Sequence, residues 1–125
     1  MNSKVFLALR ILLGLMLLVF GLNKFLHFIP TPENLPEPII NYMTALITTK
    51  AFYLVAILEI LSGLAFLLNK YGALMALILM SVSLNIILFH LSLNPEGIAP
   101  GLVVFILNVL MLYVYRDKYK DLLAG

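Results

Sequence analysis

Four long apolar segments dominate the chain, at residues 5–25, 51–68, 71–93 and 95–115. A bilayer core is about 30 Å thick, and a helix rises about 1.5 Å per residue, so about 20 apolar residues are needed to cross it. Each segment meets this requirement. The pattern therefore predicts an all-α, polytopic integral membrane protein, in which four transmembrane helices form one bundle in a single domain.

The long connection, residues 26–50, has a different pattern. Its first half contains four prolines, which prevent a continuous helix: Pro30, Pro32, Pro36 and Pro38. After the last proline, apolar residues recur at helical spacing with polar residues between them. This pattern predicts a short amphipathic helix on the membrane surface or over the mouth of the bundle. An ordered loop that covers the ends of the long helices fits the same residues.

Composition supports a membrane location. Of the 125 residues, 63% are apolar and 11% are charged, whereas soluble domains average about 45–50% and 25%. A soluble fold of this size could not bury so much apolar surface, so we expect the lipid bilayer to cover it. The net charge of +2 is too small to indicate a nucleic-acid partner. The absence of cysteine excludes disulfides and thiolate metal sites in this chain.

The basic residues predict an orientation. Four crossings place both termini and the turn at residues 69–70 on one side, which collects Lys4, Lys70, Arg116, Lys118 and Lys120. The other side holds two lysines and three carboxylates, namely Lys24, Lys50, Glu33, Glu37 and Glu96. Cytoplasmic loops of membrane proteins carry the excess of Lys and Arg. Both termini are therefore expected in the cytoplasm. The first apolar segment is interpreted as a retained helix, because Arg10 interrupts it and no cleavage pattern follows.

Glu59 lies at the midpoint of the second apolar segment. A charged side chain at the centre of a membrane helix costs about 2.5–3.5 kcal/mol, so its carboxyl must face protein, water or a ligand. Arg10, on the first segment, is the predicted partner. The Arg10–Glu59 pair could lock two helices together or belong to a substrate or proton pathway. A protonated Glu59 without a partner is the third alternative.

Further polar residues define a candidate pocket or outer cluster: Lys24, Asn85, His90, His27 and Asn108. Each predicted helix carries one stripe of small or polar residues, which either packs helices together or encloses a narrow polar pocket. His90 points about 140° away from Asn85 around its helix. The two histidines could contact a quinone, a lipid headgroup or interfacial water. They do not by themselves indicate haem, and no metal site or catalytic residue is predicted.

Several short motifs resemble the DoxX family of small bacterial four-helix membrane proteins. They are Arg10-Ile-Leu-Leu-Gly14, Phe20-Gly-Leu-Asn-Lys-Phe25, Glu59-Ile-Leu-Ser-Gly63 and Asn85-Ile-Ile-Leu-Phe-His90, followed by Asn94-Pro-Glu-Gly97. The resemblance places Arg10, Lys24 and Glu59 at charged positions of the family, without a catalytic role. It also implies the inner membrane of a bacterium. Relatives include a membrane subunit associated with thiosulfate–quinone oxidoreduction and proteins linked to redox stress or to maturation of membrane complexes.

Three functions fit these observations. The chain could be an accessory subunit of a redox-linked or other membrane complex, with no catalytic activity of its own. It could be the quinone-binding component of a membrane oxidoreductase. It could also be a small transporter or lipid-binding protein that uses the Arg10–Glu59 pair. No cofactor is predicted from the residues, quinone remains an open alternative, and the partner could be another membrane subunit or a second copy of the chain.

Overall fold

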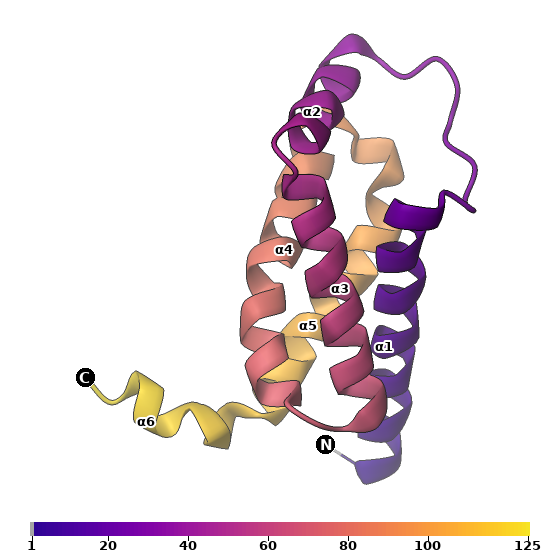
Figure 1. Ribbon diagram of the computed structural model, residues 1–125. Coiled ribbons are helices and arrows are strands. Elements are labelled where there is room, and N and C mark those ends of the chain that lie inside the picture. Colours follow the sequence, from indigo (N-terminus) through magenta and orange to yellow (C-terminus); the bar gives the residue numbers. More distant parts are fainter. Residues whose placement is uncertain (1) are drawn as a thin grey trace.

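The computed structural model describes residues 2–125, and these residues form helices and connecting turns without a strand (Figure 1). In chain order the elements are α1 (Ser3–Leu26), α2 (Glu37–Thr48), α3 (Ala51–Leu68), α4 (Gly72–Leu93), the 3₁₀ turn η1 (Pro95–Gly97), α5 (Ile98–Val114), the 3₁₀ turn η2 (Arg116–Tyr119) and α6 (Lys120–Leu123).

The four long helices α1, α3, α4 and α5 stand side by side as a bundle (Figure 1). Four segments of the described chain are long and apolar enough to cross a membrane, and they contain these helices. The predicted all-α membrane bundle is therefore confirmed. The fourth segment differs in detail, because Pro95 opens a separate tight turn in which the Gly97 N–H bonds the carbonyl of Asn94. Consequently α5 begins only at Ile98.

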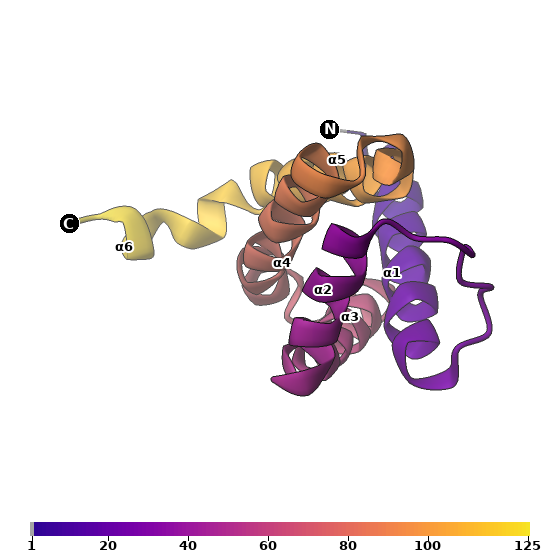
Figure 2. The same ribbon diagram turned by 90° about the horizontal axis from the view of Figure 1, so that it is seen from above.

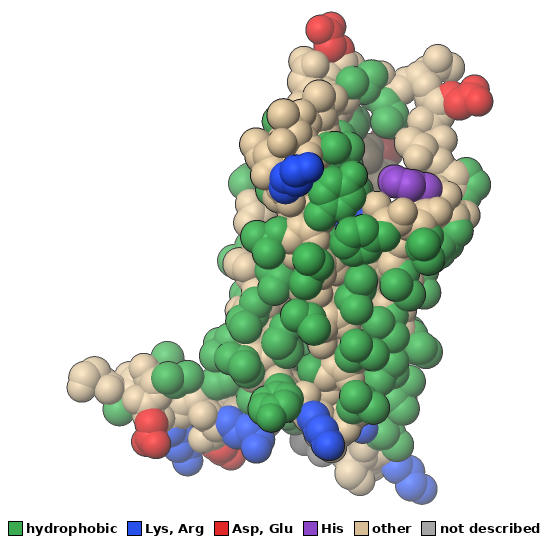
Figure 3. Space-filling view, viewed as in Figure 1, with side chains coloured by type: hydrophobic (Ala, Val, Ile, Leu, Met, Phe, Trp, Pro, Cys, Tyr) green, Lys and Arg blue, Asp and Glu red, His purple; other side chains and the backbone are tan. Residues whose placement is uncertain are grey.

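Apolar side chains fill the interior of the bundle and also cover its outside. The buried core includes Leu13, Leu17, Phe66, Leu79, Val104, Leu107 and Met111. Large apolar residues on every long helix are nevertheless exposed, among them Leu12, Leu54, Leu84 and Ile106. Figure 3 shows hydrophobic side chains over the whole visible flank of the bundle. Such a continuous apolar surface is the one that acyl chains solvate.

Two glycines bring α1 and α3 into close contact. A Cβ atom on Gly63 would lie 2.8 Å from the carbonyl oxygen of Gly14, and one on Gly14 would lie 3.0 Å from the carbonyl oxygen of Gly63. Small residues allow this approach of two backbones in membrane bundles. A further contact, of Gly21 with Ala56 and Glu59, extends this line of close α1–α3 contacts, which we call the glycine seam. These contacts fix the height of Glu59 relative to the residues of α1.

The two ends of the bundle hold different connecting segments and different charged side chains. Both termini and the α3–α4 turn lie at one end, and α2 and η1 lie at the other, which we call the outer end (Figure 1). Asn69 and Tyr71, with φ angles of 53° and 59°, adopt left-handed conformations that make the α3–α4 turn tight. Most of the lysine and arginine side chains visible in Figure 3 lie at the end with the termini, beside the carboxylates of the last segment, and further carboxylates lie at the outer end.

The amphipathic helix predicted in the first loop is confirmed as α2. It crosses the outer end of the bundle near α3 and α4 (Figure 2). Ile39 is buried, and the ring of Tyr42 stacks on that of Phe89 in α4 with centroids 4.9 Å apart. The helix is therefore packed against the mouth of the bundle, and the alternative of an ordered loop in place of this helix is wrong.

Beyond α5 the chain turns sideways. Residues of η2 and α6 run sideways, away from the bundle (Figures 1 and 2). No pattern in the sequence predicted this course.

Candidate binding site in the outer half of the bundle

Glu59 forms an ion pair with Lys24 of α1. The Lys24 Nζ and Glu59 Oε1 atoms lie 2.7 Å apart, and the side chains of these residues are 21% and 2% exposed. The structure thus corrects the predicted Arg10–Glu59 pair: Glu59 has a cationic partner on α1, but the partner comes from the opposite end of that helix.

The direction of the side chains explains the partner. Every Cα–Cβ bond of a helix tilts toward the N-terminus of that helix. Helices α1 and α3 are antiparallel, and the seam at Gly21 places Glu59 between Arg10 and Lys24 in height. Lys24 therefore leans toward the middle of the bundle and Glu59 leans toward the outer end, so they approach each other. Arg10 leans toward the N-terminus and away from Glu59.

Arg10 has a separate environment in the other half of the bundle. Its side chain is buried, and its Nη1 donates a hydrogen bond to the carbonyl of Phe66. Its guanidinium carbon lies 5.6 Å from the centre of the Phe6 ring. Within residues 2–125, the Nε atom of Arg10 has no hydrogen-bond partner. Arg10 consequently contributes to α1–α3 packing rather than to the site around Glu59.

A cavity of about 410 Å³ lies between α2, α3 and α4 and reaches Lys24 of α1. Its polar residues are Lys24, Ser81, Asn85 and His90. The remaining wall is apolar or aromatic, formed by Tyr42, Met43, Leu46, Ala51, Phe52, Leu54, Val55, Leu58, Val82, Ile86 and Phe89. Cavities of about 300–1,000 Å³ with apolar walls and a few polar groups are typical of sites for small molecules.

A second cavity, of about 230 Å³, adjoins the first. Asn23, Lys24, Glu59 and His90 supply its polar lining, and its apolar lining comes from Phe20, Ile86, Pro100, Gly101 and Val104. Lys24, Ile86 and His90 line both cavities. The ion pair therefore lies where the two cavities meet, although Glu59 itself faces only the smaller one.

Hydrogen bonds set the chemistry of His90 and Asn85. The His90 Nδ1 atom lies 3.1 Å from the carbonyl oxygen of Asn94. A carbonyl can only accept, so Nδ1 carries the proton and a neutral ring presents Nε2 as an acceptor. The Asn85 side-chain amide donates one of its two N–H groups to the carbonyl of Ser81 at 2.7 Å. Although they point in different directions around α4, both residues line the larger cavity.

The other predicted members of the cluster lie elsewhere. His27 is exposed and ends α1 in a left-handed conformation with φ 52°. Asn108 is fully buried between α4 and α5, where it accepts a hydrogen bond from Ser83 at 2.8 Å and donates one to the carbonyl of Ala76 at 3.0 Å. Asn108 thus joins two helices, as the packing interpretation expects. Asn23, which lines the smaller cavity, was missed as a site residue, although it lies beside Lys24 in the motif Phe20-Gly-Leu-Asn-Lys-Phe25.

Most residues of the candidate site lie within the part of the chain that matches a known protein family. The DoxX family model matches residues 5–91, which is more than half of the chain. The chain belongs to the DoxX family. The DoxX match includes the ion pair of Lys24 and Glu59 and also Asn85 and His90, whereas α5 and the segment after it lie outside the matched range. Comparison of this DoxX protein with curated proteins and with solved structures found no match.

Proposed function

We propose that this DoxX protein is a membrane-embedded binding subunit for a lipophilic quinone and serves a larger redox-linked membrane complex. The observation that carries the proposal is the 410 Å³ cavity, in which four polar residues interrupt an otherwise apolar and aromatic wall, namely Lys24, Ser81, Asn85 and His90. An apolar cavity with a few polar groups suits a molecule with a greasy body and a polar head.

The polar groups match both redox states of a quinone. Quinone carbonyls accept hydrogen bonds, and Lys24 has three N–H donors, of which the ion pair with Glu59 uses one. Quinol hydroxyls donate hydrogen bonds, and the Nε2 atom of His90 is an acceptor when the ring is neutral. The chain's residues would thus bind and orient the head group. Electron transfer would require a redox partner subunit.

We also propose a location and an orientation for the protein. The end of the bundle with both termini carries Lys4, Lys70, Arg116, Lys118 and Lys120. By the positive-inside rule this end faces the cytoplasm of a bacterium whose inner membrane holds the bundle. Because the chain contains no cysteine, Glu33→Cys and Gly125→Cys provide single labelling sites. A membrane-impermeant maleimide should label only the first in intact cells, and the reverse result would contradict the orientation.

The proposal is tested by solvent extraction of the protein purified in mild detergent. We expect chromatography and mass spectrometry to find close to one quinone per chain. In Ala51→Phe, an added ring would occupy the larger cavity, so the retained quinone should fall at least about 10-fold, a loss of about 1.4 kcal/mol in affinity. Ser92→Ala, at an exposed position of α4 outside both cavities, is the matched control and should retain the quinone.

The same extraction separates the alternative functions. Stoichiometric phospholipid in place of quinone would support a lipid-binding protein, and retention by Ala51→Phe equal to that of Ser92→Ala would show that the cavity is not the site. If neither variant contains a bound molecule but a partner protein co-purifies in equal amounts, the accessory-subunit interpretation replaces the proposal.

A further inference from the structure

The segment after α5 has a fixed position beside the bundle. Residues 116–123 turn away from the axis of the long helices and run sideways at the level where α5 ends (Figures 1 and 2). In a protein that spans a bilayer, this level is the boundary between acyl chains and headgroups. The segment therefore extends along the membrane surface rather than away from it.

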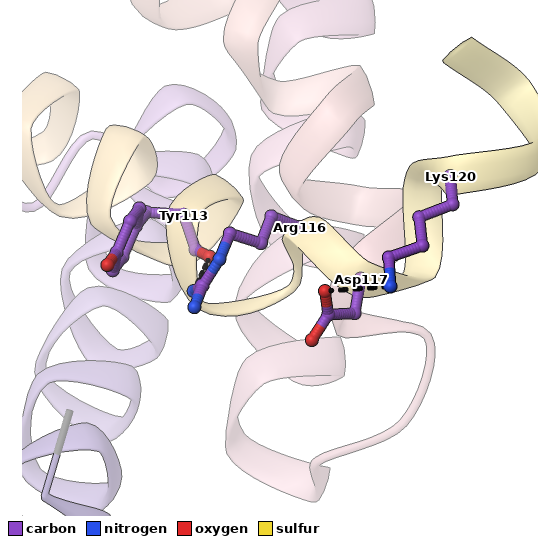
Figure 4. Close-up of polar contacts among 4 residues, drawn as sticks. All are labelled: Tyr113, Arg116, Asp117 and Lys120. Atoms are coloured by element: carbon purple, nitrogen blue, oxygen red, sulfur yellow. Dashed lines mark hydrogen bonds and ion pairs between the residues drawn. The ribbon is translucent and has the colours of Figure 1, made fainter. Parts of the chain in front are cut away.

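Three contacts hold the beginning of this segment. Tyr119 is buried, and its hydroxyl donates a hydrogen bond to the carbonyl of Ala73 in the first turn of α4 at 2.6 Å. Burial raises the pKa of Tyr119 to about 12, so the hydroxyl keeps the proton that it donates. Arg116 donates to the carbonyl of Tyr113 at 2.8 Å and lies over its ring, with 4.2 Å between guanidinium carbon and ring centre (Figure 4).

Apolar and charged side chains lie on different sides of the segment. Leu122 and Leu123 are 73% and 81% exposed. In Figure 3 the charged side chains of the segment gather along its lower edge, away from the bundle, with hydrophobic side chains above them. One ion pair joins Asp117 to Lys120, with 3.5 Å between oxygen and nitrogen (Figure 4). This division is typical of helices that lie in the plane of a membrane interface.

The charge at this end of the molecule is positive. Five exposed cations, Lys4, Lys70, Arg116, Lys118 and Lys120, face only two exposed carboxylates, Asp117 and Asp121. Basic residues near a bilayer surface are attracted to anionic lipid headgroups. The bilayer must also surround the bundle at this height, so a lipid surface is always within reach of the segment.

We propose that residues 116–125 form an interfacial anchor that selects anionic lipid headgroups. Leu122 and Leu123 insert between the acyl chains of the leaflet at this end of the bundle, and the basic side chains contact the lipid phosphates. The proposal concerns the opposite end of the molecule from the quinone site and does not depend on it. The competing interpretation is that a second copy of the chain, rather than lipid, covers the exposed leucines.

The test uses the full chain in nanodiscs with single cysteines that carry an environment-sensitive fluorophore. Leu123→Cys reports the apolar side of the segment, and Asp121→Cys reports a charged position as the matched control. The chain has no other cysteine. Discs contain either neutral phosphatidylcholine or a mixture with phosphatidylglycerol, and a water-soluble quencher measures the exposure of each label.

In discs with phosphatidylglycerol, we expect the label at position 123 to be quenched at least about threefold less efficiently than the label at position 121. The difference should shrink in neutral discs, in high salt and in the background Lys118→Gln with Lys120→Gln, because each removes electrostatic attraction. Equal quenching at both positions in all discs would overturn the proposal. Protection that follows the number of protein copies per disc, rather than lipid charge, would also overturn it and would assign the leucines to a contact between copies.

Discussion

Breaking the ion pair of Lys24 and Glu59 should destabilise the bundle strongly, because both charges lie within it. At 2.7 Å and an effective dielectric constant of about 20, their attraction is about 6 kcal/mol. Much of that energy offsets the desolvation of two charges. Glu59→Gln and Lys24→Met should therefore each lower the free energy of unfolding by about 3 kcal/mol, because each leaves one charge without a partner. The cost for Lys24→Met should be the larger, since Glu59 is only 2% exposed.

A double-mutant cycle measures the pair itself. Lys24→Met combined with Glu59→Gln removes both charges, so it should cost no more than either single substitution. The resulting coupling energy is about 3 kcal/mol or more. The assay is unfolding of the protein from mild detergent by increasing sodium dodecyl sulfate, followed by far-ultraviolet circular dichroism. The matched control is the cycle of Arg10→Met with Glu59→Gln, for which the coupling should stay below about 0.5 kcal/mol.

The outcome decides between the two cations of α1. A coupling energy below about 0.5 kcal/mol for Lys24 and Glu59 would refute the argument from side-chain direction. A larger coupling for Arg10 than for Lys24 would restore the ion pair expected from the sequence and would move the charged centre toward the termini.

Two further predictions concern helix packing, and both are measured by the same unfolding assay. Gly63→Ala should cost about 1–3 kcal/mol, because its Cβ would meet the carbonyl oxygen of Gly14 at 2.8 Å and push the two helices apart; an unchanged stability would mean that the seam yields freely. Asn108→Leu should cost about 1–2 kcal/mol, since it removes hydrogen bonds with Ser83 and Ala76. Adding Ser83→Ala should then cost little more, and additive losses would contradict the shared bond.

The architecture could be predicted because hydrophobicity decides it. Each long helix is an apolar segment of nearly the length that a bilayer demands, and the helical spacing after Pro38 was sufficient to predict α2, although Pro38 itself lies in the first turn of that helix. Polar residues at depth also directed attention to Glu59, since hydrocarbon does not tolerate an isolated carboxylate. Each of these features follows from the free energy of transferring a side chain from water into hydrocarbon, which can be assigned residue by residue.

The partners of those residues could not be predicted in the same way, because they depend on register and direction. Counting residues along straight helices pointed to Arg10 as the partner of Glu59, whereas the close α1–α3 contacts at the glycines and the tilt of each side chain bring Lys24 to it. Asn108 and His90 were grouped as polar residues, yet one faces a helix neighbour and the other a cavity. The segment after Val114 is too short and mixed in composition for periodicity to show its course.

The position of α2 restricts how any molecule could enter the larger cavity. Tyr42, Met43 and Leu46 form one wall of that cavity, and the stacked rings of Tyr42 and Phe89 join α2 to α4. The flanks of the neighbouring helices are covered by apolar side chains. A ligand that first dissolves in the surrounding leaflet would reach the site by lateral diffusion. Its partitioning into the bilayer would raise its local concentration around the protein. Even a ligand of weak affinity could then keep the cavity filled, whereas a water-soluble ligand would lack this high local concentration.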